Sequence, residues 1–201
     1  MSAKKLLIIL LSILLLNFSS ISAEDYKRII LGSTKNIAKN PHDTAGSTYY
    51  NDPAADFGLS FGLAIGSKKD KKIIETEVFY NTKSTHKLLN DVKAEVTTLA
   101  MMTNFFYAPD IGSKSNSYGL IGGGLGLGRT EVTAKYSGGA DPGANSQWTL
   151  GYQYMIGFGI DNIEIVYKHM DLGTVKSGGS ATYTPDKFDN ISNSINIRYK
   201  F

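Results

Sequence analysis

The chain has 201 residues, enough for one domain, with 21 Lys and Arg, 18 Asp and Glu, and no cysteine. The near balance of charge lacks the excess of basic residues that holds nucleic-acid phosphates, so a nucleic-acid partner is not expected. The absence of cysteine excludes disulfides, cysteine-ligated metals and a lipid anchor attached to a cysteine.

Residues 1–23 have the layout of a secretory signal peptide. Two lysines precede an apolar run at 6–16, and small residues follow at 19–23. The run is shorter than the roughly 20 residues that a spanning helix needs. An uncleaved anchor is the alternative, but the charges that usually follow such an anchor are replaced by small residues. We therefore expect export, removal of the signal peptide and a mature domain over 24–201.

Period-2 alternation of apolar and other residues dominates the rest of the chain and predicts β-strands. In the last such segment Ile197, Tyr199 and Phe201 share one face, while Asn196 and Arg198 lie on the other. The alternation is weak in the first segment, and the glycine-rich fifth segment leaves its faces unassigned. Eight strands are predicted, over residues 26–35, 57–66, 73–80, 93–107, 117–130, 147–158, 163–169 and 191–201.

The connections between these segments alternate in length. The long, polar connections are 36–56, 83–92, 131–146 and 172–190. The shorter ones are 67–71, 108–116 and 159–162. An up-and-down antiparallel arrangement places all the long connections at one end, which is typical of barrels in the bacterial outer membrane.

A soluble β-sandwich also alternates, so the composition of the second face decides between the two architectures. Here that face is mainly Gly, Ser, Ala, Thr and Gln, which suits the narrow interior of an eight-stranded barrel. Aromatic residues gather near predicted strand ends, as in interfacial girdles: Tyr26, Tyr80, Phe105, Tyr107, Tyr118, Trp148 and Phe201. The predicted fold is all-β, an eight-stranded antiparallel up-and-down transmembrane β-barrel in the cell outer membrane.

Charged residues on the polar faces of the strands are expected to converge inside this barrel. They are Glu75, Glu77, Glu164, Lys168 and Arg198. An eight-stranded barrel has room inside only for side chains, which favours an ion-pair network that fills the lumen and holds the strand register. The alternative is a gated, narrow ion path.

No cofactor, metal site or catalytic centre is predicted. His42, His86 and His169 lack the spacing of metal ligands. A lipid-modifying hydrolase would need Ser, His and an acid close together; His169 and Asp171 share one face, but no nucleophile motif accompanies them. The glycine run at 122–128 lacks the Lys-Ser or Lys-Thr and the following helix of a phosphate-binding loop.

Several segments match a known family in their order and spacing. They are 57–81 (FGLSFGLAIGSKKDKKIIETEVFYN), 99–107 (LAMMTNFFY), 118–128 (YGLIGGGLGLG), 148–173 (WTLGYQYMIGFGIDNIEIVYKHMDLG) and the closing INIRYKF. The mature chain resembles the small eight-stranded outer-membrane barrels of the opacity-like and alphaproteobacterial surface-antigen type. The resemblance implies that Ile197, Tyr199 and Phe201 form the signal read by the barrel-assembly machinery.

We expect an outer-membrane surface protein, antigen-like, adhesin-like or structural, that presents four loops outside the cell. Its expected partners are outer-membrane lipid, the barrel-assembly machinery and, through the loops, host surface molecules. The alternatives are an integral lipid-modifying hydrolase and a narrow porin. Aromatic and basic residues in the predicted loops fit a binding surface: Tyr49, Tyr50, Lys83, His86, Lys87, Lys135, Tyr136, Lys176, Tyr183 and Lys187.

Overall fold

The computed structural model describes residues 24–42, 54–87, 92–112, 116–136, 144–176 and 187–201. Its strands are β1 (Glu24–His42), β2 (Ala54–Lys69), β3 (Lys72–Lys87), β4 (Val92–Tyr107), β5 (Ser117–Tyr136), β6 (Ala144–Ile160), β7 (Ile163–Lys176) and β8 (Lys187–Lys200). No helix within the described ranges is long and apolar enough to cross a bilayer. The predicted signal peptide lies outside the described residues.

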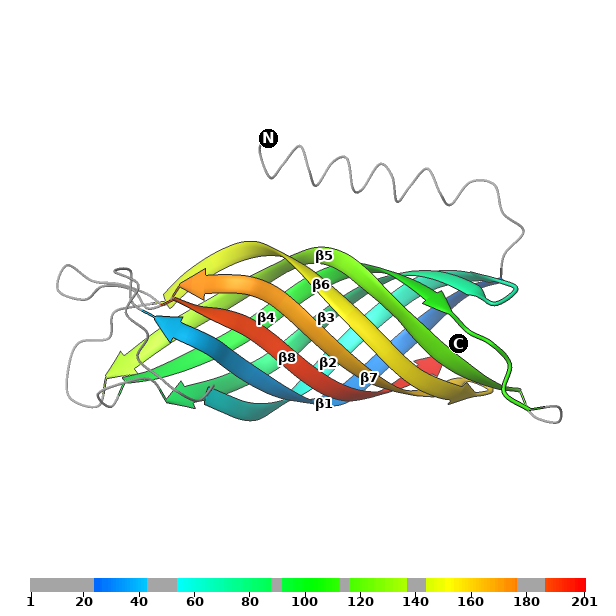
Figure 1. Cartoon of the computed structure of the whole chain (residues 1–201), viewed down its shortest axis with the longest axis horizontal. Coiled ribbons are helices and arrows are strands. Elements are labelled where there is room, and N and C mark those ends of the chain that lie inside the picture. Colours follow the sequence, from blue (N-terminus) through cyan, green and yellow to red (C-terminus); the bar gives the residue numbers. More distant parts are fainter. Residues whose placement is uncertain (1–23, 43–53, 88–91, 113–115, 137–143, 177–186) are drawn as a thin grey trace, which may run out of the picture.

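The strands form one closed antiparallel barrel (Figure 1). Each strand pairs with its neighbours in sequence, and β8 pairs with β1. At this closing seam Phe201 and Lys27 exchange two backbone hydrogen bonds of 3.0 and 3.1 Å. The predicted fold class is therefore confirmed. We call the end with the short connections, Glu24 and Phe201 the turn end, and the opposite end the mouth.

Apolar side chains cover the outside of the barrel. On β2, Phe57 and Leu63 are 69% and 63% exposed, whereas Ser60 and Ala64 on the alternate face are buried. This division confirms the predicted faces, and all eight strands contribute to it. The outward residues, which we call the apolar belt, include Ile29, Leu31, Phe57, Leu59, Phe61, Leu63, Ile65, Val78, Leu99, Phe105, Ile121, Leu125, Trp148, Leu150, Ile156, Phe158, Ile163, Ile165, Ile195, Ile197 and Phe201.

The strands are longer than predicted, at the expense of the long connections. The prediction followed apolar alternation, whereas the antiparallel ladder continues through polar outward residues such as the register pair Lys93 and Lys135. Backbone hydrogen bonding does not require apolar side chains, so the pattern ends before the strand does. Segments predicted as connections that are strand instead are 36–42, 54–56, 67–69, 83–87, 92, 131–136, 144–146, 159–160, 172–176 and 187–190.

Strand β5 turns alternate glycines toward the lumen, which settles the faces that its sequence left open. A Cβ atom at Gly126 would lie 2.6 Å from Met102 Sδ, and one at Gly128 would lie 2.7 Å from a methyl carbon of Leu172. The missing side chains therefore make room for the buried side chains of Met102 on β4 and Leu172 on β7. Leu125 and the other outward side chains of β5 join the apolar belt.

Two of the aromatic residues assigned to the girdles point inward instead. Tyr26 and Tyr118 are only 6% and 9% exposed. They lie near strand ends, as expected, but parity along the strand decides which face a side chain takes. The remaining predicted girdle residues are exposed on the outside: Tyr80, Phe105, Tyr107, Trp148 and Phe201.

Candidate functional site

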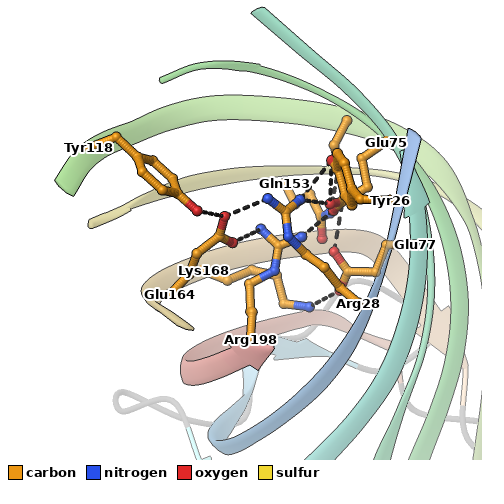
Figure 2. A network of polar contacts seen from close by, with 10 residues as sticks. Tyr26, Arg28, Glu75, Glu77, Tyr118, Gln153, Glu164, Lys168 and Arg198 are labelled. Atoms are coloured by element: carbon orange, nitrogen blue, oxygen red, sulfur yellow. Dashed lines mark hydrogen bonds and ion pairs between the residues drawn. The ribbon is translucent and has the colours of Figure 1, made fainter. Parts of the chain in front are cut away.

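Near its turn end the lumen is crossed by four charged side chains, which we call the inner ion cluster: Arg28, Glu75, Glu164 and Arg198. Arg28 lies between the two carboxylates, with Nη1 donating to Glu75 and Nη2 donating to Glu164 (Figure 2). Arg198 donates to Glu75 through Nη2, and its Nη1 lies 3.4 Å from Glu164 Oε2. Each carboxylate is thus shared by both arginines, which links β1, β3, β7 and β8 across the lumen.

Two tyrosine hydroxyls add hydrogen bonds to the inner ion cluster. Tyr26 Oη donates to Glu75 Oε2 at 3.1 Å and accepts from Arg28 Nη1 at 2.7 Å. Tyr118 Oη donates to Glu164 Oε1 at 2.6 Å (Figure 2). Hydrogen bonds of this kind offset part of the cost of removing carboxylates from water.

A second ion pair lies farther along the lumen toward the mouth. Lys168 Nζ donates to Glu77 Oε1 at 2.6 Å and lies 3.8 Å from the ring centroid of Phe79. Asn104 Nδ2 donates to Glu77 Oε2 at 3.2 Å, and Gln153 Nε2 donates to Asn104 Oδ1 at 2.7 Å. Both oxygens of Glu77 are therefore engaged, and the contacts connect β3, β4, β6 and β7.

These six charged side chains are almost completely removed from solvent, with exposed fractions of 0–3%. The structure brings together all five predicted interior residues, namely Glu75, Glu77, Glu164, Lys168 and Arg198. Sequence reasoning missed Arg28, because the alternation around it is weak. One signal could have found it: the five predicted residues carry three negative charges and two positive ones, and buried charges need a balance.

Apolar side chains fill the lumen around the ion pairs. One cluster lies beside the inner ion cluster and includes Ile73, Phe106, Leu120, Met155 and Val166. A second includes Phe79, Met102, Met170 and Leu172, and a third, near the mouth, includes Val96, Val132, Val175 and Phe188. This layered interior has the character of a packed core, as expected for eight strands.

The three histidines lie in separate places. His42 ends strand β1, and His86 is buried inside the barrel with Nε2 3.0 Å from Ser84 Oγ. His169 faces outward and stacks on Tyr154, with 4.6 Å between ring centroids. His42 and His86 fall within the predicted connections 36–56 and 83–92; this prediction is wrong for both, since the ladder pairs His42 with Lys187 and His86 with Ala94. In the described part of the chain no group of three His, Cys, Asp or Glu could hold a metal ion.

His169 and Asp171 share the outward face of β7, but they have different partners. His169 Nδ1 lies 2.7 Å from Asn193 Oδ1. Asp171 accepts from Tyr152 Oη at 3.3 Å and from the backbone N–H of Gly173 at 2.7 Å. Among the residues that the structure describes, no serine hydroxyl contacts His169. Acyl hydrolysis needs a nucleophile hydrogen-bonded to a base. His169 and Asp171 do not provide that arrangement with any serine of the described chain.

Ion pairs lie on the outer surface between the apolar belt and the mouth. Glu95 on β4 lies 2.9 Å from Lys135 Nζ and 3.2 Å from Lys83 Nζ. The hydrogen bond from Lys135, reinforced by Lys83, holds the pKa of Glu95 below its usual value. Exposed pairs of this kind contribute little to stability, but they mark where the apolar belt gives way to a polar rim.

The three residues of the predicted assembly signal lie on the outward face of β8. Ile197, Tyr199 and Phe201 are all exposed and belong to the turn-end part of the outer surface. On the alternate face of the strand, Asn196 and Arg198 point into the lumen and are buried. Strand β8 therefore contributes to both sides of the barrel wall: Arg198 belongs to the inner ion cluster, and its neighbours Ile197 and Tyr199 belong to the outer surface.

The fold and the interior together define a class: a closed eight-stranded antiparallel barrel, apolar outside, with a charge-balanced and packed lumen.

The chain is similar to small outer-membrane barrels of known structure. Neisserial surface protein A has 16% identity and a TM-score of 0.49, over 90% of this chain and 100% of that chain. Ail of Yersinia pestis, in complex with the heparin analogue sucrose octasulfate, has 10% identity and a TM-score of 0.46, over 88% and 99%.

An outer-membrane enzyme is also among the similar structures. The protease OmpT of Escherichia coli has 9% identity and a TM-score of 0.40, over 91% of this chain and 99% of that chain. No family model and no curated protein matches the sequence. At these identities and TM-scores, none of the similarities assigns the chain to a family or gives it an activity.

Proposed function

We propose that this protein is an outer-membrane surface protein, exported through the signal peptide at 1–23 and inserted as a barrel. The observation that carries the proposal is the apolar belt, to which every strand contributes. In water such a continuous surface would drive aggregation, whereas an apolar band about 25 Å tall faces lipid in outer-membrane barrels.

The proposed orientation places the mouth outside the cell and the turn end in the periplasm. The connection lengths support it, since outer-membrane barrels keep their short turns in the periplasm. The stretches at 43–53, 88–91, 137–143 and 177–186 then face the exterior.

In this orientation the outer stretches are the parts of the chain that meet other molecules. We infer that they bind host surface molecules, in the manner of an antigen or adhesin, while lipid surrounds the apolar belt. Tyrosine is enriched at binding surfaces. The tyrosines of the outer stretches, Tyr49, Tyr50 and Tyr183, lie outside the described residues. The exposed Lys135 and Lys176, at the mouth ends of β5 and β7, add positive charge beside the outer stretches.

Protease treatment of intact cells tests insertion and orientation together. We expect cuts within 43–53, 88–91, 137–143 and 177–186, and none at the turns around Asp70 and Asp161 until the outer membrane is permeabilised. Cuts at Asp161 in intact cells would show that the turn end faces the exterior, opposite to the proposed orientation. Recovery of the chain in a detergent-free periplasmic extract would refute insertion. If variants without the outer stretches bind host cells as the natural chain does, the adhesin role fails.

We propose further that Phe201 is part of the signal for the barrel-assembly machinery. Phe201→Ala removes an outward ring but keeps the two backbone hydrogen bonds to Lys27. We expect a several-fold loss of the heat-modifiable folded form in cells, with unfolding of the purified barrel changed far less. Ile160→Ala, at a similarly exposed position of the turn end, is the control. An equal loss for both variants would show that Phe201 contributes only hydrophobic surface.

The porin and hydrolase alternatives have less support. The lumen holds balanced ion pairs and three apolar clusters, which suits a packed core better than a path for ions. His169 contacts Asn193 and Tyr154 instead of a serine. We therefore favour a role in which the barrel is a scaffold and the outer stretches make the contacts.

A further inference from the structure

A row of polar side chains lies at the mouth-side edge of the apolar belt, on three neighbouring strands. Asn193 on β8 pairs in register with Lys35 on β1 and, on its other side, with His169 on β7. The residues before and after each of them are buried, so all three side chains point outward. We call Lys35, Asn193 and His169 the edge row.

The edge row lies where the outward residues change from a continuous apolar series to a mixed one. On β1, Leu31 is exposed on the belt, and Lys35 is the second outward residue after it. On β8, Asn193 directly follows Ile195 in the outward series. The headgroup layer on each side of a bilayer is about 5–8 Å thick, which is about two residues of a strand. In the proposed orientation the edge row therefore lies at the headgroups of the outer leaflet.

Two side chains of β7 hold Asn193 in one orientation. Its Oδ1 accepts from Tyr167 Oη at 2.8 Å and lies 2.7 Å from His169 Nδ1. Because the amide oxygen is held by β7, the amide nitrogen on the other branch is turned away from β7, on the side of β1. Its two N–H donors are therefore on the same side of Asn193 as the neighbouring Lys35.

These donors have no acceptor in the part of the chain that the structure describes. Neither Lys35 Nζ nor Asn193 Nδ2 makes a hydrogen bond or an ion pair there. The outward carboxylates of the adjoining strands, Asp171 and Asp189, accept hydrogen bonds from other residues. A cation and an amide donor side by side, with no protein acceptor for either, suit an anion.

Cations beside the belt on the opposite side of the barrel have acceptors within the protein. Lys83 lies 3.2 Å from Glu95, and Arg129 Nε donates to Ser146 Oγ at 2.7 Å. In bulk water a lysine needs no such acceptor, because water hydrates it. Beside the belt, however, lipid headgroups displace part of that water, and their phosphates are the acceptors at this depth. Lys35 is therefore the cation of the belt edge whose surroundings leave room for a lipid phosphate.

We propose that Lys35 and Asn193 bind the phosphate group of a lipid in the outer leaflet, whose acyl chains lie along the belt beside Leu31 and Ile195. The proposal rests on the proposed membrane insertion and orientation. A lipid fits better than a soluble anion, because exposed apolar side chains begin directly on the turn-end side of the donors. A lipid supplies the anionic and the apolar groups together. His169 contributes by holding the Asn193 amide in place.

Lipid retention by the folded protein tests the proposal. The probe is lipid A, a phosphorylated glycolipid, and its dephosphorylated form is the matched comparison. The protein is extracted from outer membranes and exchanged into detergent micelles that contain one lipid or the other, and native mass spectrometry counts the lipid that stays bound. We expect about fivefold weaker retention of the dephosphorylated form. Equal retention of the two forms would overturn the proposal.

Single substitutions locate the phosphate on the barrel. Lys35→Met removes the cation, and Asn193→Asp replaces the amide donors by a carboxylate; each should lower retention of lipid A about fivefold. The control is Lys39→Met, because Lys39 shares the outward face of β1 but lies nearer the mouth, with Asp189 as its register partner. We expect it to change retention little. Equal losses for Lys35→Met and Lys39→Met would show a diffuse effect of positive charge and refute the site.

Two further measurements separate the alternatives. Inorganic phosphate in large excess should leave lipid A bound, because it offers no acyl chains; complete displacement would assign the edge row to a soluble anion. Lys35→Arg keeps the cation and should retain lipid A, so the comparison with Lys35→Met stands even if Asn193→Asp fails to fold. A loss as large as that of Lys35→Met would overturn the role of the cation. Heat-modifiable mobility reports folding, and its absence in the natural chain would refute the proposed membrane insertion itself.

Discussion

Replacing Arg198 with methionine is expected to destabilise the folded barrel by about 3–5 kcal/mol, the usual cost of removing one partner from a buried ion pair. Arg198 is 1% exposed and contacts both Glu75 and Glu164. Without it, two buried carboxylates share the single guanidinium of Arg28. Equilibrium unfolding by urea in lipid vesicles, followed by gel mobility, measures the change.

The control for Arg198→Met is Lys200→Met on the same strand. Lys200 lies 3.4 Å from Glu24, and that carboxylate is largely exposed. Such an exposed pair contributes only about 0–1 kcal/mol. Adding Glu75→Gln to Arg198→Met should recover part of the loss, because it removes the uncompensated charge. If Arg198→Met costs no more than Lys200→Met, the inner ion cluster does not hold the barrel together.

Placing a lysine on the lipid face is the second change with a large expected effect. Leu63→Lys should cost about 2–4 kcal/mol of folding free energy in a bilayer. Leu63 pairs in register with Ile29 on β1 and Val78 on β3, and all three are exposed on the outside. The new ammonium group would therefore lie among lipid chains with no partner. The measurement is the same vesicle unfolding experiment.

Thr85→Lys is the matched control for Leu63→Lys, because Thr85 lies outward on β3 nearer the mouth than the belt residue Val78. There the added charge reaches water and headgroups, and we expect a change close to zero. A barrel that lived in water would respond in the opposite way, since Leu63→Lys would then replace an exposed apolar side chain by a solvated one. Stabilisation by Leu63→Lys would therefore refute membrane insertion.

The inward or outward direction of most side chains could be predicted from the sequence. Glu75, Glu164 and Arg198 were assigned to the lumen by parity alone, and the structure places them there. Tyr26 and Tyr118 are predicted for the girdles because they lie near strand ends, but the structure places both inside, in the two segments whose alternation is weak or unassigned. In each case the period-2 geometry of a strand decides, and it depends only on neighbouring residues.

The contacts between distant residues could not be predicted in the same way. Arg28 and Glu75 are 47 positions apart, and Arg28 and Glu164 are 136 apart. Whether they meet depends on how far each strand is displaced along its neighbours when the barrel closes. The partnership of His169 with Asn193 depends on the β7–β8 register, which the sequence does not state.

The sequence by itself determined the number of strands, their order and the face that most side chains take. It did so because alternation is local, and because an apolar face and a polar face cannot exchange places without a one-residue slip. Only the tertiary structure decided where the strands end, which six charges meet in the lumen and which polar groups gather on the outer surface. Those features follow from closure of the barrel, since closure sets every register at once.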